Sequence, residues 1–261
     1  MAANMMSTAL AGLNTFNTAL SIVSDNIANA NTTGWKSNTV DFGDLVSGLL
    51  ATSSSNTTAQ GVGSSVLGVR SDFTTGSEVQ TGTWSDLMIQ GSGFFSVQDP
   101  TSSLVSYTRD GSFQVDTSGY LTDMNGNQVL DVSGKPIQIT NPSTYSSFAI
   151  DKYGNLTGTD STGAVSQIDQ IGISTFSNPN GLVREGNNDY TPGSSAGAPT
   201  TPATAGTGQA GTIISGALEG SNVDLTAQMV NLINYQADYQ ANSKSIETGN
   251  TLLQTVVNLI R

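Results

Sequence analysis

The sequence predicts an α+β fold, in which N- and C-terminal helices pair as an axial coiled coil and a central domain is rich in antiparallel β-strands. Three observations lead to this prediction. Apolar residues recur with a seven-residue period at residues 6–30 and again at 225–260. Between them the period is two residues, and Gly, Asp, Asn and Ser interrupt the short β-branched and aromatic runs. Stretches rich in Gly, Ser and Thr separate each end from the middle.

The N-terminal helix is expected to begin near Asn4 or Ser7 and to fade near Asn31, where Asn-Thr-Thr-Gly supplies turn residues. Its apolar residues follow one another at spacings of three and four, which keeps one stripe facing a partner helix. Gly34 suits the left-handed conformation that follows a helix. The predicted packing residues of this first seam are Met6, Leu13, Phe16, Leu20, Val23 and Ile27.

The C-terminal helix shows the same period. Ser221 or Asn222 is expected to cap it, and Asp224 in the first turn favours the positive end of the helix dipole. The predicted packing residues of this second seam are Leu225, Met229, Leu232, Tyr239, Ile246, Leu253, Val257 and Ile260, with polar Gln236, Ser243 and Asn250 at alternate positions.

Two such helices indicate self-assembly. A narrow apolar stripe on a lone helix buries too little surface to offset the entropy lost when the helix is ordered. Each helix is therefore expected to pair with the other and then with neighbouring copies of the chain. The alternative is an ordinary helical hairpin inside a monomer.

These patterns divide the chain into five segments. Residues 1–36 form the N-terminal axial helix and a motif, 37–65 a connecting arm, 66–190 the β-rich body, 191–220 a linker and a return strand, and 221–261 the C-terminal axial helix. The linker at 191–211 is too poor in apolar residues to fold alone. Residues 51–65 are expected to be a flexible arm or an exposed loop, and Thr212–Ser215 in the fourth segment is expected to be a strand.

Turn chemistry is clearest in the body. Asp116 and Asp151 each begin an Asp-x-x-Gly-x-Leu pattern, in which Asp caps its own turn and Gly adopts positive φ, so both are predicted to be hairpin turns. A calcium loop is the alternative, but neither segment has the alternating carboxylates and closing Glu that such a loop requires. The GSGFF run at 91–95 is predicted to be a tight turn leading into a core strand.

Composition excludes several functions. The 261 residues contain no Cys and no His, which removes disulfides, thiolate catalysis and the commonest general base and metal ligand. Eight basic against twenty acidic residues give a net charge of −12, which argues against binding nucleic acid. No apolar run approaches the length of a membrane span, and the interrupted apolar pattern of the first residues is not the one expected of a cleavable signal peptide. We therefore expect no enzyme activity, cofactor, metal or membrane insertion.

Arg109 is one of the few basic residues of the body. We expect it to be a surface charge or to form an intersubunit ion pair.

Five segments resemble a known family. SDNIANANTTGWK at 24–36 resembles the N-terminal motif of bacterial flagellar rod and hook proteins, which reads N-N-I-A-N-x-x-T-x-G-aromatic-K, with Asp25 in place of the usual Asn. GSGFF at 91–95, YTRDGSFQVDTSGYL at 107–121, TFSNPNGL at 175–182 and ALEGSNVDL at 217–225 resemble that family's successive motifs in the same order. The motif positions carried over are Asn26, Asn29, Gly34, Trp35, Lys36, Ser221, Asn222 and Val223.

The resemblance implies a structural subunit of the flagellum. Terminal helices of this family form the innermost tubular layer around an export channel, and the β domain forms the next layer outward. The implied partners are further copies of the chain as a homo-polymer, other axial proteins (rod, hook cap and hook–filament junction) and the type III export apparatus. The implied location is the hook or basal body, reached without a cleaved signal peptide.

The family member is predicted to be a short hook protein. The segments VDFGDLVSG at 40–48, DFTTGSEVQTG at 72–82 and LLQTVVNLIR at the C-terminus resemble the hook protein more than the distal-rod protein. Hook proteins usually carry a further outer domain, for which 261 residues leave little room. The alternative is therefore the distal-rod protein.

A remoter alternative is a secreted β-rich adhesin or carbohydrate-binding module. Its sugar-stacking platform would consist of Trp84, Tyr107, Phe113 and Tyr120.

Overall fold

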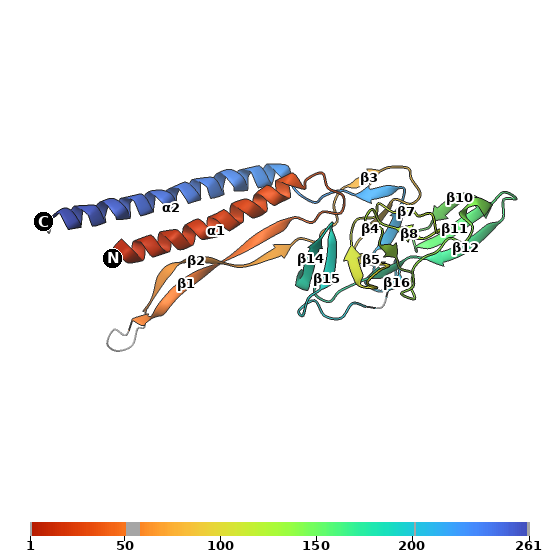
Figure 1. The fold of residues 1–261 in the computed structure, drawn as a ribbon, viewed down its shortest axis with the longest axis horizontal. Coiled ribbons are helices and arrows are strands. Elements are labelled where there is room, and N and C mark those ends of the chain that lie inside the picture. The colour runs from red at the N-terminus through yellow and green to blue at the C-terminus, as the bar shows by residue number, and fades with distance from the viewer. Residues whose placement is uncertain (1, 51–57, 201, 260–261) are drawn as a thin grey trace. The chain divides into compact units, whose positions relative to one another are not determined.

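A computed structural model of the chain describes residues 2–50, 58–200 and 202–259, which fall into two compact units. Unit 1 contains the described residues of 1–28, 38–71 and 224–261, and unit 2 contains 29–37 and 72–223. The helices and strands, labelled in Figure 1, are α1 (Ala2–Ala28), β1 (Asn38–Leu50), β2 (Thr58–Ser71), β3 (Glu78–Gln80), β4 (Leu87–Gln90), β5 (Phe94–Gln98), β6 (Val105–Thr108), β7 (Gln114–Val115), β8 (Leu121–Thr122), β9 (Gln128–Val129), η1 (Pro142–Thr144), β10 (Tyr145–Ile150), β11 (Asn155–Asp160), β12 (Val165–Gln170), β13 (Gly172–Ser174), η2 (Pro179–Gly181), β14 (Leu182–Gly186), β15 (Asp189–Pro192), β16 (Ala203–Thr204), β17 (Thr212–Ser215), β18 (Ala217–Glu219) and α2 (Leu225–Leu259).

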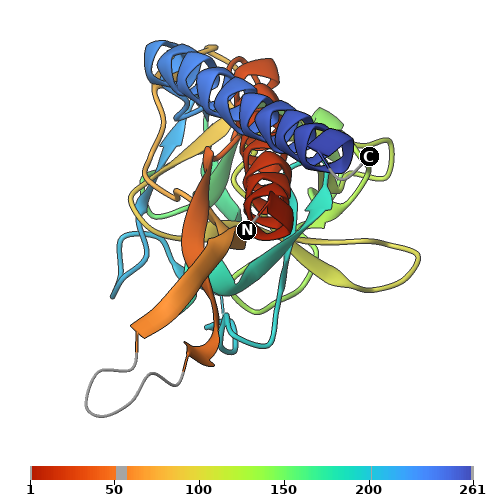
Figure 2. The ribbon, with the colours of Figure 1, turned by 90° about the vertical axis from the view of Figure 1, so that its left-hand side faces the viewer.

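Unit 1 consists of the two terminal helices and one long hairpin. Helix α1 lies between α2 on one side and the β1–β2 hairpin on the other, as Figures 1 and 2 show. The hairpin is antiparallel and runs from the pair Asn38↔Ser71 to the pair Leu50↔Thr58, with three irregularities in its register. The two predicted helices are thus present, and they contact each other.

The hairpin differs from the prediction for residues 37–65. The sequence predicts a connecting arm there, whereas all of its described residues from 38 onwards belong to β1 and β2. The alternation Val40, Phe42 and the facing Val66 supplies side chains for a two-stranded ribbon, and α1 covers part of it. Contact with a helix stabilises strands whose own composition favours a flexible chain. Residues 51–57, the first half of the predicted flexible stretch at 51–65, lie outside the described residues.

Local chemistry sets the start of α2. The Asp224 carboxylate accepts hydrogen bonds from the backbone N–H groups of Thr226 (2.9 Å) and Ala227 (3.2 Å), which makes Asp224 the N-cap. The prediction that Ser221 or Asn222 caps this helix is therefore wrong. Both precede the helix, and the Asn222 side chain bonds to the body of unit 2 instead.

Unit 2 is built from antiparallel strands. Its largest sheet has the order β14-β15-β6-β5-β9-β8-β7, and β13 pairs with both β5 and β16. A second sheet has the order β10-β11-β12, and the pairs β17-β4 and β18-β3 bring the end of the unit back to its beginning. The fold class is α+β, as predicted, and the predicted strand at Thr212–Ser215 is β17.

Two hydrophobic clusters share strand β5. Phe94 and Phe95 are consecutive, so their side chains point to opposite faces of the strand. Phe95 belongs to a cluster with Leu87, Ile89 and many other buried aliphatic residues, and Phe94 belongs to an aromatic cluster with Tyr107, Phe176 and Tyr190. The GSGFF segment is therefore a tight turn, with Gly91 and Gly93 at positive φ, that leads into a core strand as predicted.

An aspartate turn recurs five times in unit 2. Asp116 illustrates it: one carboxylate oxygen accepts the N–H groups of Ser118 and Tyr120, both at 2.8 Å, and Gly119 has φ +85°. The two predicted turns, at Asp116 and Asp151, are confirmed. The other three lack the Leu of the predicted pattern, because the turn needs only the Asp acceptor and the glycine; they begin at Asp123, Asp131 and Asp160.

The predicted linker packs on the body. Ala196 and Ala205 are fully buried, and the Thr200 hydroxyl accepts the Thr175 N–H at 2.9 Å. Its last part contributes β16 to the main sheet. A low-complexity composition predicts disorder because it offers little apolar surface. Here its small side chains fit close to other strands, so hydrogen bonds and tight packing hold the segment.

Candidate assembly site

The first predicted seam lies at the edge of the covered face of α1. Ala9 and Val23 are buried, whereas the large side chains of Met6, Leu13, Phe16, Leu20 and Ile27 are half-buried. The fully covered stripe is displaced by about one residue and consists mainly of small or polar side chains: Ala9, Gly12, Thr15, Ala19, Val23 and Asn26. The larger seam residues therefore keep apolar surface that a further partner can cover.

Small residues bring α1 and α2 together. A methyl group at Gly12 would lie 2.8 Å from the Asn242 Oδ1, and one at Gly249 would lie 3.1 Å from the Met6 Cγ. Neither glycine belongs to a predicted seam. Of Asn242 and Met6, which they face, only Met6 belongs to one, the first seam. Glycine allows the helix backbones to approach closely, at some cost in helix propensity. The sequence pattern of large apolar residues did not reveal these contacts.

The hairpin contributes aromatic and polar contacts to the helices. Phe16, Phe42 and Tyr235 form a triangle of rings with centroid separations of 6.0 to 6.2 Å. The Thr15 hydroxyl bonds to the Ser64 carbonyl at 2.9 Å. The Asn26 side chain pairs with both backbone groups of Asn38, at 2.7 and 2.8 Å. This amide pair joins the end of α1 to the start of β1, which gives the motif residue Asn26 a structural role.

Helix α2 leaves most of its apolar side chains exposed. Among its described residues only Gly249 is buried. In the second predicted seam Leu232 and Ile246 are half-buried, and Leu225, Met229, Tyr239, Leu253 and Val257 are between 40% and 62% exposed. Ile260 lies outside the described residues. Further exposed apolar residues, which the heptad pattern does not include, are Val230, Ile233, Leu252, Val256 and Leu259.

This exposure is the strongest sign of an interface. Soluble monomers rarely expose contiguous apolar surface of this extent, and such surface marks sites of protein association. The polar seam residues Gln236, Ser243 and Asn250 are also exposed. Helix α2 therefore offers apolar side chains in several directions around its axis, more than one partner helix would cover.

The remaining motif residues lie in unit 2, where two distant segments meet. We call residues 29–37 the motif segment and residues 216–223 the return segment. Gly34 has φ +69°, the predicted left-handed conformation, and its N–H bonds to the Glu219 carbonyl at 2.7 Å. Trp35 is buried, with the Arg184 guanidinium 3.8 Å from its ring centroid. The Asn29 carboxamide oxygen accepts a hydrogen bond from Thr32.

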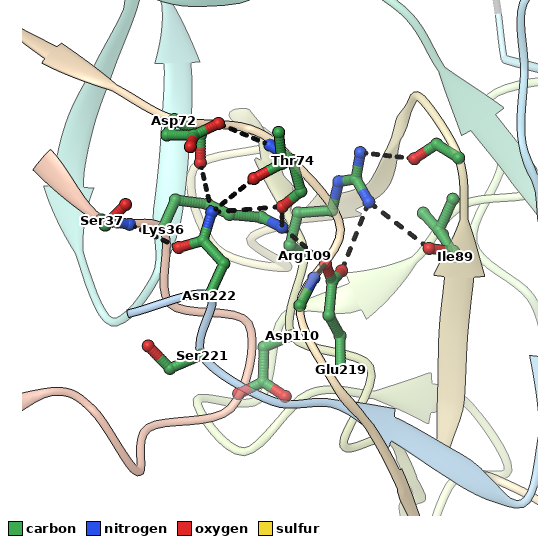
Figure 3. Close-up of polar contacts among 12 residues, drawn as sticks. Lys36, Ser37, Asp72, Thr74, Ile89, Arg109, Asp110, Glu219, Ser221 and Asn222 are labelled. Carbon is green, nitrogen blue, oxygen red and sulfur yellow. Dashed lines mark hydrogen bonds and ion pairs between the residues drawn. The ribbon is translucent and has the colours of Figure 1, made fainter. Parts of the chain in front are cut away.

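Asn222 ties the return segment to its surroundings (Figure 3). Its side-chain oxygen accepts the Ser37 N–H at 2.7 Å, and its side-chain nitrogen donates to the carbonyl of Asp72 at 2.8 Å and to that of Thr74 at 3.2 Å. Neighbouring Ser221 and Val223 are half-buried and linked by a local hydrogen bond of 3.3 Å. A single amide thus satisfies backbone groups from two other segments, residues 29–37 and 72–74.

A buried ion triad lies beside Asn222 (Figure 3). The Lys36 Nζ lies 2.5 Å from one Glu219 carboxylate oxygen, and the Arg109 Nη1 lies 3.3 Å from the other. Glu219 also accepts the Gly76 N–H at 2.9 Å. All three charged side chains are at least 98% buried. Burial lowers the pKa of Lys36, and the Glu219 carboxylate acts in the opposite direction.

The triad corrects the prediction for Arg109. Arg109 is not on the surface, and its ion pair is formed within the chain. The sequence contained a usable signal for its partner: a period of two places Glu219 on the same face of β18 as the buried Ala217. The carbohydrate-binding platform also fails, because Tyr107 and Phe113 are buried in different clusters and Trp84 packs against Phe148.

The pKa of Asp189 predicts how the stability of the protein depends on pH. Asp189 is nearly buried on β15, and desolvation, followed by the charges of Asp123, Asp110 and Glu185, raises its pKa to about 7. Between about pH 4 and 7 the folded state then holds a proton that the unfolded state has lost, so stability falls as pH rises through this window. We expect Asp189→Asn to remove up to about 1.4 kcal/mol per pH unit of this slope.

The measurement is urea unfolding of both proteins between pH 4 and 8. The control is Asp116→Asn, which changes a half-buried turn aspartate outside this carboxylate group. An unchanged slope in Asp189→Asn would contradict the assignment of the proton to Asp189.

The described residues contain no group of three or more His, Cys, Asp or Glu side chains arranged to hold a metal ion. Within the same residues, neither helix is long and apolar enough to cross a membrane.

Three parts of the chain match flagellar families. Residues 6–36 match "Flagella basal body rod protein", residues 88–158 match "Flagellar hook protein FlgE/F/G D1 domain", and residues 214–259 match "Flagellar basal body rod FlgEFG protein C-terminal". The first and last matches contain the two terminal helices and the motif residues around Lys36 and Asn222. The middle match covers the strands from β4 into β11.

Several curated relatives align along nearly the whole chain. The flagellar basal-body rod protein FlgG of Bacillus subtilis (strain 168) is 36% identical over 97% of each chain. FlgG of Borreliella burgdorferi is 32% identical, again over 97% of each chain. The flagellar hook protein FlgE of Escherichia coli (strain K12) is 25% identical over 97% of this chain and 99% of its own.

The motifs, the exposed terminal helix and the full-length similarity agree. The predicted family resemblance is confirmed. The chain belongs to the family of flagellar axial proteins that includes the basal-body rod protein FlgG and the hook protein FlgE.

Proposed function

We propose that this protein is the subunit of the distal rod, the part of the flagellar basal body that precedes the hook. The observation that carries the proposal is the alignment length. The B. subtilis rod protein aligns over 260 residues, whereas the alignment with the E. coli hook protein extends over 409. A chain of 261 residues cannot fill the longer alignment, so the hook relative has additional segments that this chain lacks.

This proposal replaces the hook protein as the first interpretation. The hook interpretation rested on short motifs at residues 40–48, 72–82 and 252–261, and one comparison still supports it. The hook protein FlgE of Treponema pallidum is 40% identical, although only over 44% of this chain and 24% of its own. The shared stretch is consistent with a family in which rod and hook subunits have similar cores. The hook remains the alternative.

In the proposed polymer, copies of the chain cover the exposed side chains of α2 and the half-buried seam of α1. The helices pair as an axial coiled coil in the innermost layer, and the β-rich unit lies outside it. The weak intrinsic helix propensity of the many Asn, Ser and Thr residues suits helices that neighbours stabilise. The proposed partners are further copies of the chain, the adjoining axial proteins and the type III export apparatus.

The test is electron microscopy of basal bodies from cells that lack this protein. Loss of a distal-rod subunit is expected to leave a truncated rod, whereas loss of a hook subunit leaves a rod with rings and no hook. Cells re-supplied with the protein are the control. Polymers of the purified protein give a second measurement, since a rod is straight and a hook is curved. Curved polymers together with complete rods in the deletion strain would restore the hook interpretation.

A further inference from the structure

The motif segment and the return segment are joined by backbone hydrogen bonds as well as by charges. Besides the bond from Gly34 to the Glu219 carbonyl, the Ser37 N–H bonds to Asn222 at 2.7 Å, and the Asn222 N–H lies 3.4 Å from the Trp35 carbonyl. The Lys36 and Glu219 side chains are 183 residues apart in sequence. The contact therefore closes most of the chain into one loop.

The charges at this contact are unequal. Lys36 and Arg109 share one carboxylate, and among the described residues Glu219 is the acid that forms an ion pair with either of them. Both cations also donate to backbone carbonyl groups. Lys36 donates to Thr74 at 2.7 Å, and Arg109 donates to Gly91 at 2.9 Å and to Ile89 at 3.5 Å. The three buried side chains thus carry one excess positive charge, which the carbonyl dipoles and the nearby charge of Asp72 partly offset.

The motif segment depends on the return segment for its charge balance. Docking the motif segment without Glu219 would bury Lys36 beside Arg109 with no counter-ion. A buried ion pair that loses one partner destabilises a protein strongly, because the other charge remains desolvated. Docking Glu219 without Lys36 is less costly, because Arg109 still balances it.

We propose that Lys36, Arg109 and Glu219 form an electrostatic latch, which allows the motif segment to dock on the rest of unit 2 only when the return segment is in place. The latch makes docking of the two segments one cooperative step. A chain that emerges from its N-terminus keeps residues 29–37 undocked until residue 219 is available. Unit 2 therefore reaches its closed form only when nearly the whole chain is present. This inference concerns closure of the subunit and is the same for a rod or a hook protein.

The chain offers a direct reporter of the latch. It contains two tryptophans, and Trp35 lies in the motif segment, where it is 6% exposed. In the full chain carrying Trp84→Phe, acrylamide quenching of fluorescence reports docking of Trp35. Hydrogen exchange followed by mass spectrometry reports protection of the motif and return segments separately.

Three variants of this background are compared. Glu219→Gln removes the shared carboxylate and retains its shape. Lys36→Met/Glu219→Gln also removes one of the two cations, which leaves Arg109 with its carbonyl acceptors. The matched control is Glu78→Gln, the same chemical change at the exposed residue that pairs with Glu219 across the β3–β18 ladder.

The latch predicts a rescue. Glu219→Gln is expected to lower the protection of both segments together by about a hundredfold or more and to expose Trp35 to acrylamide. The double variant is expected to regain part of this protection, because only one unpaired cation then remains buried, and Glu78→Gln is expected to behave like the background. If Glu219→Gln fails to fold, recovery of a folded, protected double variant supports the latch.

Three results would overturn it. They are an unchanged Glu219→Gln, a loss of protection in one segment only, and a double variant that is no better protected or folded than Glu219→Gln. A purely steric role for Glu219 predicts the last of these, because the double variant changes one more buried side chain.

Discussion

Replacing Leu253 by Asp should abolish polymerisation and leave the subunit folded. Leu253 is 40% exposed on α2 and borders a shallow surface groove with Val257. In the free subunit a carboxylate there remains in water, so the fold tolerates it. In a polymer that covers this face, the carboxylate would be buried without a partner, at a cost of several kcal/mol for every subunit. The concentration needed for assembly should rise at least about a hundredfold.

The measurements are sedimentation of polymers, circular dichroism of the soluble subunit and motility of cells carrying the variant. Thr255→Asp is the matched control, because it places the same charge at an exposed polar position of α2 that does not line this groove. Leu20→Asp on the half-buried first seam is expected to act in the same direction but also to weaken unit 1. Normal polymers and normal motility in Leu253→Asp would show that this face is not an assembly surface.

The second large effect is expected for Gly34→Ala. Gly34 has φ +69°, and an added methyl carbon would lie 2.7 Å from the Asp110 backbone nitrogen and 2.8 Å from the Arg109 carbonyl carbon. Backbone atoms in a sheet-rich unit cannot move aside as a flexible side chain can. The conformational penalty of about 1 kcal/mol is therefore joined by a steric one, and we expect a total loss of about 3 kcal/mol or more.

Gly163→Ala separates these two contributions. Gly163 has φ +85° in an aspartate turn, and a methyl group there would meet no atom of the described residues within 4 Å. Gly163→Ala should therefore lose only the conformational part of the free energy of unfolding. Urea unfolding monitored by fluorescence and far-ultraviolet circular dichroism gives both values. Equal losses for the two variants would show that unit 2 relaxes around residue 34 and that its close approach to the body is dispensable.

Local elements could be predicted from sequence. The terminal helices, strand β17, the turns at Asp116 and Asp151 and the left-handed Gly34 all depend on residues within a few positions of one another. The family motifs were equally readable, because they are contiguous. The choice between rod and hook could not be read from the sequence in the same way. Short motifs near β1, near β3 and at the C-terminus favoured the hook protein, whereas the total length favoured the rod protein.

Boundaries and partners were decided by tertiary contacts. The arm at 37–65 and the linker at 191–211 have compositions that favour flexible chains, yet helix α1 covers one and the main sheet receives the other. The N-cap of α2 is Asp224 and not the predicted Asn222, because the Asn222 side chain bonds to Ser37 and to the Asp72 carbonyl. An amide that serves distant backbone groups cannot also cap the helix that follows it.

By itself the sequence determined the α+β class, the two apolar helices and the family, because periodicity and contiguous motifs are properties of neighbouring residues. Only the tertiary structure decided that Arg109 and Lys36 are buried and that both depend on Glu219. The free energy of a buried charge depends on the counter-ion beside it, and here that counter-ion comes from a segment 110 residues from one cation and 183 from the other. The period of two in β18 indicates only that Glu219 faces inward, and no local pattern shows which distant cations it meets.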